Sequence, residues 1–228
     1  MERKMMFLIT GVCTVLVVIG SVQNCCPPPK LEIKAVGSGV MISTGSNDPY
    51  TGYSKIYHDE VNRKFVKDVF VKFEKAGPLT LFVLEDYAGG KQYTVLNGSC
   101  SVRPLTGDFN RQLCESESNY KGEMNLGLGN DVFPMNLYKR NYSNLDYDIS
   151  GDAMVFPISG NRCLLQSEMI NAYKNSVFQA KESAFLYDAK ASICNSSIFD
   201  VPTQCQDRGT LRFKPHFNIQ LHALKINI

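Results

Sequence analysis

Short segments in which apolar and polar residues alternate follow one another along most of this chain. Val69, Val71 and Phe73 share one parity while Asp68 and Lys72 take the other, as a strand with one buried face requires. Because Gly, Asn, Asp and Pro separate these segments, the pattern predicts an antiparallel all-β fold with minor α content. Strands are expected at residues 31–36, 54–59, 65–73, 79–84, 92–96, 122–128, 153–158 and 184–187.

Two other segments need separate comment. Residues 166–181 are the one stretch that could carry a helix of useful length, although Asn171, Asn175 and Ser176 weaken it. Residues 207–228 alternate again and are expected to be a C-terminal extension that could supply an extra strand.

The first residues have the pattern of a secretory leader. Arg3 and Lys4 precede an apolar run over residues 5–20, and Gly20 and Ser21 offer small residues for cleavage. This run is shorter than the roughly 20 residues that span a bilayer, which favours a cleaved signal peptide over a transmembrane anchor. We expect a signal peptide at residues 1–21, with cleavage between about 20 and 24, and a single domain at 25–206.

Cysteines and glycosylation sequons agree with export. None of the cysteines that remain after the leader has the spacing of a zinc site, so disulfides are expected. Their number is odd, so one thiol stays free or bridges to a second chain; they are Cys25, Cys26, Cys100, Cys114, Cys163, Cys194 and Cys205. Acceptor sequons begin at Asn97, Asn141 and Asn195, and we expect at least two to carry glycans.

Charge and motifs argue against two functional classes. The formal net charge is +2, and no segment concentrates Lys or Arg, so the basic surface that binds nucleic acid is missing. No nucleophile elbow is present, and His58, His216 and His222 lack the spacing of metal ligands. We predict a binding protein that is not an enzyme and that requires no cofactor.

One acidic segment begins like a calcium loop. Asp146, Asp148 and Asp152 alternate with other residues, and Gly151 occupies the sixth position. The twelfth position is Pro157 instead of a bidentate glutamate. Two interpretations stay open: a polar turn between strands, or a weak extracellular calcium site formed by these three aspartates.

The order of these features resembles the ependymin family, specifically its invertebrate ependymin-related branch. The likeness covers about residues 25 to 206. The matching features are Cys26-Pro27, the Tyr-His-Asp-Glu-Val-Asn-Arg-Lys-Phe segment at 57–65, the hairpin from Leu81 to Val95 closed by Cys100, Tyr120-Lys121-Gly122-Glu123, the central Cys163, and the Phe-Asp-Val-Pro-Thr-Gln-Cys segment at 199–205. This chain departs from the family after Cys163, where Leu164 and Leu165 replace the usual proline and valine.

The resemblance implies a fold, partners and a disulfide pattern. The fold would be two stacked antiparallel sheets forming a curled half-barrel around an apolar pocket, similar to bacterial lipoprotein carriers. Homodimers, calcium association and lipid-like ligands or contact with the extracellular matrix would follow. The resemblance also implies that Cys25 or Cys26 pairs with Cys163, and that Cys100 pairs with Cys205. Cys114 and Cys194 then remain as the third pair, which leaves one N-terminal cysteine free or intermolecular.

Two functional hypotheses follow. The first is a secreted, disulfide-bonded glycoprotein that binds a hydrophobic, lipid-like molecule between its sheets. The second is a calcium-dependent adhesive or structural glycoprotein of the extracellular matrix with no small-molecule ligand. For the first, each candidate wall residue could equally be ordinary core, because a sandwich must fill those positions. The candidates are Phe70, Phe73, Leu81, Val83, Tyr93 and Val95.

Overall fold

The computed structural model describes residues 25–43, 46–105, 107, 109, 114–128, 130–143, 147–159 and 161–206. The expected signal peptide at 1–21 and the expected extension at 207–228 therefore lie outside the described residues. The strands are β1 (Lys30–Ser43), β2 (Ser46–Asp59), β3 (Lys64–Phe73), β4 (Gly77–Asp86), β5 (Lys91–Leu96), β6 (Ser99–Pro104), β7 (Tyr120–Leu128), β8 (Asp131–Ser143), β9 (Asp148–Pro157), β10 (Cys163–Lys174) and β11 (Val177–Lys190).

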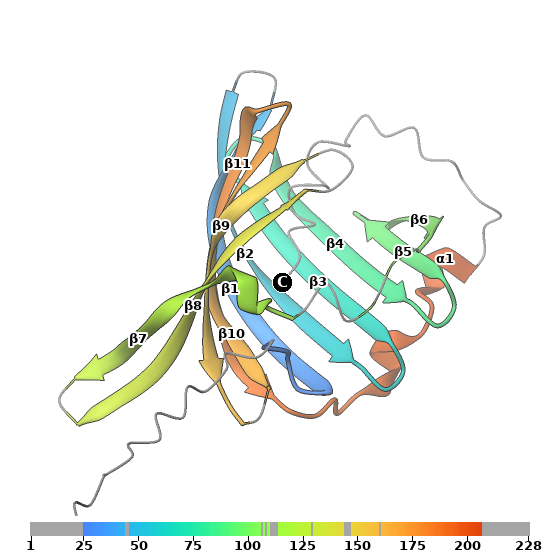
Figure 1. Ribbon diagram of the computed structural model, residues 1–228. Coiled ribbons are helices and arrows are strands. Elements are labelled where there is room, and N and C mark those ends of the chain that lie inside the picture. The colour runs from blue at the N-terminus through green and yellow to red at the C-terminus, as the bar shows by residue number, and fades with distance from the viewer. Residues whose placement is uncertain are drawn as a thin grey trace, which may run out of the picture.

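The predicted all-β fold is confirmed. The eleven strands form one antiparallel sheet in the order β6-β5-β4-β3-β2-β1-β11-β10-β9-β8-β7. Figure 1 shows that this sheet curls without closing, and that the β7–β8 hairpin projects away from the curl. The expected half-barrel is present, and its two layers belong to a single continuous sheet. We call these layers the two arms of the curl: one contains β3 to β5, and the other contains β8 to β11.

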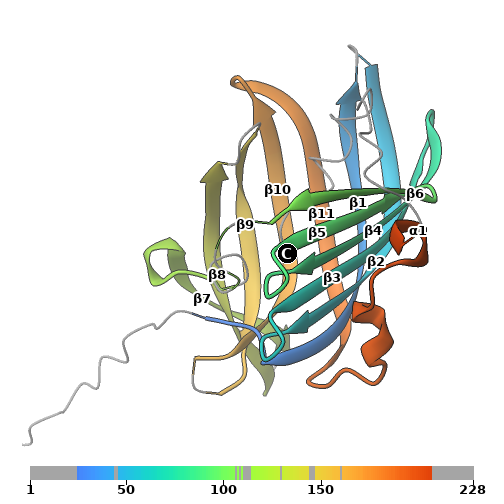
Figure 2. The ribbon, with the colours of Figure 1, turned by 90° about the vertical axis from the view of Figure 1, so that its right-hand side faces the viewer.

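The arms of the curl pack against each other through the concave face. Figure 2 shows strands β3 to β5 crossing in front of β1 and β11. The largest core cluster lies at the end of the curl where β1 ends and β2 begins, and it joins residues of both arms. Its members are Met41, Tyr50, Val69, Val71, Phe73, Leu79, Leu81, Val83, Tyr147, Ile149, Ile170, Ala172 and Ala180.

The end of the described chain covers the convex face of the arm that contains β3 to β5. The 3-10 helix η3 (Ser196–Phe199) inserts Phe199, 7% exposed, against Val66 and Leu84. The short helix α1 (Thr203–Gln206) lies beside β5 and β6, where Cys205 is bonded to Cys100 of β6. This segment explains why β4 has an almost continuous apolar run: Leu81 and Val83 pack in the core cluster, and Phe82 and Leu84 pack in the cluster with Phe199.

The helix expected at residues 166–181 is wrong. The segment is the β10–β11 hairpin, and it turns at Asn175 and Ser176, whose φ angles are 50° and 63°. Asn tolerates this left-handed region better than most residues, so the same residues that weaken a helix make the turn. Ile170 and Ala172 alternate onto the concave face, as a strand requires.

Three disulfides join the described cysteines. Cys100 pairs with Cys205 as expected, and of the two candidates for Cys163 it is Cys25 that forms the bond. The expected Cys114–Cys194 pair is wrong, because Cys114 pairs with Cys26. The backbones of Cys25 and Glu115 form an antiparallel bridge, which places the next two residues, Cys26 and Cys114, opposite each other with 4.1 Å between their Cα atoms. Among the described cysteines the free one is Cys194, which is exposed. The expected free or intermolecular N-terminal cysteine is therefore wrong, because Cys25 and Cys26 are both paired.

Candidate ligand-binding site

An apolar hollow opens on the concave face at the end of the curl opposite the largest core cluster. Its empty volume is about 490 Å³, including space open to solvent. Strands β1, β2, β3, β8, β9, β10 and β11 all contribute to its wall, so the hollow exists only when both arms are in place. It is lined by Pro27, Leu31, Ile33, Ile56, His58, Phe65, Glu115, Arg140, Val155, Cys163, Leu165 and Leu186.

Apolar side chains reach the hollow through the register of neighbouring strands. Ile33 of β1 is directly opposite Ile56 of β2, and Ala35 is opposite Leu186 of β11. Because side chains alternate between the faces of a sheet, these residues and Leu31 form one apolar floor. Phe65 and Leu165 are only half-buried against that floor, so their side chains still face open space.

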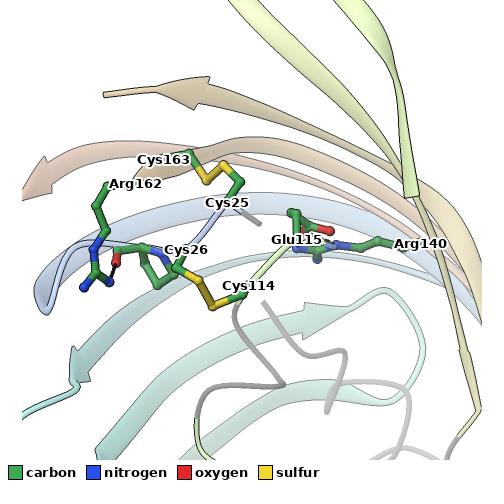
Figure 3. The surroundings of a disulfide bond; sticks show 8 residues. Cys25, Cys26, Cys114, Glu115, Arg140, Arg162 and Cys163 are labelled. Carbon is green, nitrogen blue, oxygen red and sulfur yellow. Dashed lines mark hydrogen bonds and ion pairs between the residues drawn. A yellow bond between two sulfur atoms is a disulfide. The ribbon is translucent and has the colours of Figure 1, made fainter. Parts of the chain in front are cut away.

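Two disulfides hold polar segments at the rim of this hollow. Figure 3 shows Cys25–Cys163 and Cys26–Cys114 on either side of the N-terminal segment, with Glu115 turned toward Arg140. We call residues 25–27, 114–115 and 161–163 the staple. The amide of Cys163 donates to the carbonyl of Cys26 over 2.8 Å, and the staple therefore places Pro27 and Glu115 in the wall.

The staple is also tied to the β2–β3 turn. Arg162 Nη1 donates to the carbonyl of Pro27 over 2.6 Å and to Glu60 Oε2 over 2.9 Å. The amide of Glu60 in turn donates to the carbonyl of Pro29 over 2.7 Å. The rim of the hollow is thus fixed by covalent bonds and charge-assisted hydrogen bonds.

Among the residues that line the hollow, His58 alone has a side chain with ring nitrogens. It lies between Leu31 and Phe65 in the sheet register, and all three residues line the hollow. The side chain is 4% exposed, and its ring stacks on Phe109 with 4.9 Å between the ring centroids. Burial lowers the pKa of His58 to about 4, with Arg162 acting in the same direction and Glu60 against it, so the imidazole is neutral near pH 7. Nδ1 is buried with no hydrogen-bond partner among the described residues.

A buried ion network separates the hollow from the core cluster. Arg140 Nε donates to Glu115 Oε1 over 2.8 Å, and Nη1 donates to Glu168 Oε2. All three residues are buried. Desolvation raises the pKa of Glu168 to about 7 despite the nearby Arg140, so this carboxyl is poised to take up a proton near neutral pH.

A second hollow, of about 390 Å³ including open space, lies beyond this network. Its wall contains Lys67, Glu182 and Tyr50, whose hydroxyl donates to Glu182 Oε2 over 3.0 Å. Desolvation raises the pKa of both Glu182 and Tyr50. Gly37 and Gly52, directly opposite each other, leave this part of the wall without side chains. With two charged groups and a phenol in its wall, the second hollow suits an apolar ligand less well than the first.

None of the expected wall residues lines either hollow. Phe73, Leu81 and Val83 do face the interior, but residues of the opposite arm fill the space in front of them. Tyr93 and Val95 belong to the opposite face, where Tyr93 packs in the cluster beneath Phe199. Phe70 also faces outward and stacks on Tyr53 with 5.3 Å between the ring centroids. Alternation identified buried positions but could not show which ones the second arm would fill.

The expected calcium ligands are not brought together as a set. Asp148 and Asp152 are exposed positions of β9 that lie four residues, or about 13 Å, apart along the strand. One ion cannot bind both, since calcium–oxygen distances are about 2.3–2.6 Å. Asp146 lies outside the described residues. Across the described ranges, no group of three or more His, Cys, Asp or Glu side chains is arranged to hold a metal ion.

All three sequon asparagines are exposed. Asn97 occupies the β5–β6 turn with a φ of 45°, and its Oδ1 accepts from the amide of Thr80 over 2.9 Å. Asn195 caps η3, and its Oδ1 accepts from Ser197 Oγ over 2.7 Å. Asn141 is in β8. In the part of the chain that the structure describes, no helix is long and apolar enough for a membrane crossing.

Sequence reasoning missed the ion network and the role of His58. Glu168 was hidden in the expected helix, and Arg140 lies in a strand that the alternation did not reveal. The available signal was weak: in the strand expected at 54–59, His58 shares its parity with the aliphatic Ile56.

Comparisons with known proteins do not assign a family. No family model and no curated protein matches the chain. Among solved structures, a DUF1329 family protein from Desulfovibrio piger is 10% identical, covers 76% of this chain and 90% of its own, and gives a TM-score of 0.28. A LolA superfamily protein from Nitrosomonas europaea is 10% identical, covers 79% of this chain and 94% of its own, and gives a TM-score of 0.31. At TM-scores this low, the likeness assigns no function to the chain.

Proposed function

We propose that this protein binds a small hydrophobic, lipid-like molecule in the apolar hollow and acts as a binding protein, not an enzyme. The observation that carries the proposal is the wall itself: seven strands converge on a concave hollow lined mainly by aliphatic side chains. Ligand sites are typically concave and mostly apolar, with a few polar groups that orient the ligand. The charged groups in the wall are paired within the protein, so a ligand need not supply a charged partner for them.

An extracellular location belongs to the same proposal. Three disulfides, three exposed sequon asparagines and the leader-like sequence at residues 1–21 support it. Membership in the ependymin-related family is likewise proposed. It is supported by the Cys25–Cys163 and Cys100–Cys205 bonds, which the resemblance implied. Homodimerisation, calcium association and matrix contact stay predictions, and ligand binding does not depend on them.

The test compares two phenylalanines of β3. Phe65 lines the hollow, whereas Phe70 is a similarly half-buried residue of the opposite face. We expect the secreted, oxidised full chain to bind the uncharged fluorophore N-phenyl-1-naphthylamine, measured by its fluorescence increase. Phe65→Thr should weaken binding about tenfold or more through lost apolar contact, since burying a phenylalanine is worth about 1.5–3 kcal/mol.

The matched control is Phe70→Thr, which should bind the fluorophore like the parent protein. Both variants are checked for folding by thermal unfolding and by their disulfide pattern. Equal loss of binding in the two variants, or no binding by the parent protein, would refute the hollow as the ligand site.

A further inference from the structure

The polar side chains in the wall of the hollow differ in whether they already form hydrogen bonds within the protein. Glu115 and Arg140 are bonded to each other, and Arg140 is also bonded to Glu168. His58 is the exception, because its Nδ1 is buried and has no partner among the described residues. A buried polar atom without a hydrogen bond costs about 1–3 kcal/mol, so its presence in a binding wall calls for a partner.

The position of His58 fits a role toward the ligand. The residue is flanked in register by Leu31 and Phe65, so apolar surface surrounds the imidazole on the concave face. Stacking on Phe109 fixes the plane of the ring. A ligand lying on the aliphatic floor would therefore meet a single polar side chain that still lacks a bond.

The charged groups in the wall restrict the chemical class of the ligand further. Two carboxylates surround the single guanidinium of Arg140, so the network offers no unpaired cation to an acidic headgroup. Glu115, and Glu168 in its ionised form, would instead repel a second anion and raise the cost of burying it. An uncharged group carries no such cost.

From these observations we infer that the ligand is an uncharged, mainly aliphatic molecule with one hydroxyl group, and that His58 Nδ1 forms a hydrogen bond with that hydroxyl. A neutral imidazole presents one donor and one acceptor nitrogen, and a hydroxyl can pair with either. Long-chain alcohols and sterols belong to this class, whereas fatty acid anions do not. The inference rests on the proposed function, since it names the ligand class of the same hollow.

The experiment uses three ten-carbon probes with the secreted full chain at pH 7.5. Decan-1-ol, 1-chlorodecane and decanoate are each titrated against bound N-phenyl-1-naphthylamine. The loss of fluorescence gives their dissociation constants for the parent protein and for His58→Phe. The phenylalanine keeps an aromatic ring to stack on Phe109 and removes both nitrogens. We expect the substitution to weaken decan-1-ol binding about 3- to 10-fold more than 1-chlorodecane binding, the range of one net hydrogen bond. Decanoate should bind the parent protein more weakly than decan-1-ol.

Failure of the inference can be told from failure of the proposed function. If the parent protein binds neither the fluorophore nor any probe, the proposed function fails. If the fluorophore binds but His58→Phe weakens decan-1-ol and 1-chlorodecane equally, or decanoate binds tighter than decan-1-ol, only the inference fails. Phe70→Thr serves as the control variant, and His58→Leu repeats the comparison if His58→Phe does not fold.

Discussion

At the scale of single residues, the concave face holds polar groups that burial has changed. His58 is kept neutral by desolvation, and Glu168 is held near its titration point although Arg140 is bonded to it. In both cases removal from water is the first cause, and the charged neighbours only adjust the result. Each residue therefore makes the stability of the protein depend on pH.

The first prediction concerns the sign of that dependence for His58. Its pKa is lower in the folded protein, about 4, than the ordinary 6.5, so the unfolded chain binds its proton more readily. Stability contributed by the neutral ring is present above pH 6.5 and is lost as the pH falls toward 4. His58→Phe should remove about 2 kcal/mol of the destabilisation between pH 7.5 and pH 5.

Urea unfolding of the two proteins at both pH values measures this difference. Glu168 acts in the opposite direction: its raised pKa means that its contribution is lost as the pH rises through about 7. Comparing the parent protein with His58→Phe cancels that contribution. An unchanged pH dependence in the variant would contradict the burial of a neutral histidine.

A second residue-scale prediction contrasts buried and exposed ion pairs. Arg140→Met leaves Glu115 and Glu168 buried without their cation, so unfolding free energy should fall by about 3–5 kcal/mol. Lys34→Met breaks an ion pair with Asp188 whose side chains are 36% and 41% exposed, and stability should hardly change because water screens that pair. Chemical denaturation of both variants tests the contrast, and similar losses would argue against a buried network.

At the scale of structural elements, the staple decides the shape of the hollow. It joins the N-terminal segment to β10 and to residues 114–115, which are distant in sequence from both. The two bonds close loops with sequence separations of 138 and 88 residues, each worth about 4–5 kcal/mol in the chain-entropy account. The Cys100–Cys205 bond holds the end of the described chain on β6 in the same way.

The staple yields a prediction about thiol chemistry. After secretion and denaturation without reductant, a maleimide reagent should label one cysteine, Cys194, because the other described cysteines are paired. Peptide mapping by mass spectrometry identifies the labelled position. Cys194→Ser should abolish labelling and leave the fold intact, since Cys194 is exposed. Label on Cys26 or Cys114 would contradict the Cys26–Cys114 bond.

At the scale of the whole molecule, one sheet supplies both the core and the ligand site. The two arms of the curl meet tightly at one end and leave the hollow at the other, with the ion network between them. The molecule therefore needs no second domain to build a concave site. Its exposed surface carries the sequon asparagines, none of which lines the hollow.

The prediction at this scale is that glycans decorate the surface without closing the site. Enzymatic removal of N-glycans should lower the mass of the secreted protein, and N-phenyl-1-naphthylamine binding should be the same before and after. Single Asn→Gln variants at Asn97, Asn141 and Asn195 would assign the sites by intact mass, with at least two in use. A mass unchanged by the enzyme would contradict the secretory interpretation.

The sequence by itself determined the all-β class and most of the strands, because a strand with one buried face must alternate and a turn needs residues such as Gly90. It did not reveal β8, and it left the β10–β11 hairpin open to a helical interpretation. It also pointed to oxidised cysteines and, through a family resemblance, to two of the three disulfides. It could not separate pocket from core, since Leu81 and Leu31 have the same local pattern and differ only in what the opposite arm places before them. Only the tertiary structure decided that difference, the partner of Cys114 and the pairing of Arg140, because each depends on contacts between strands far apart in the chain.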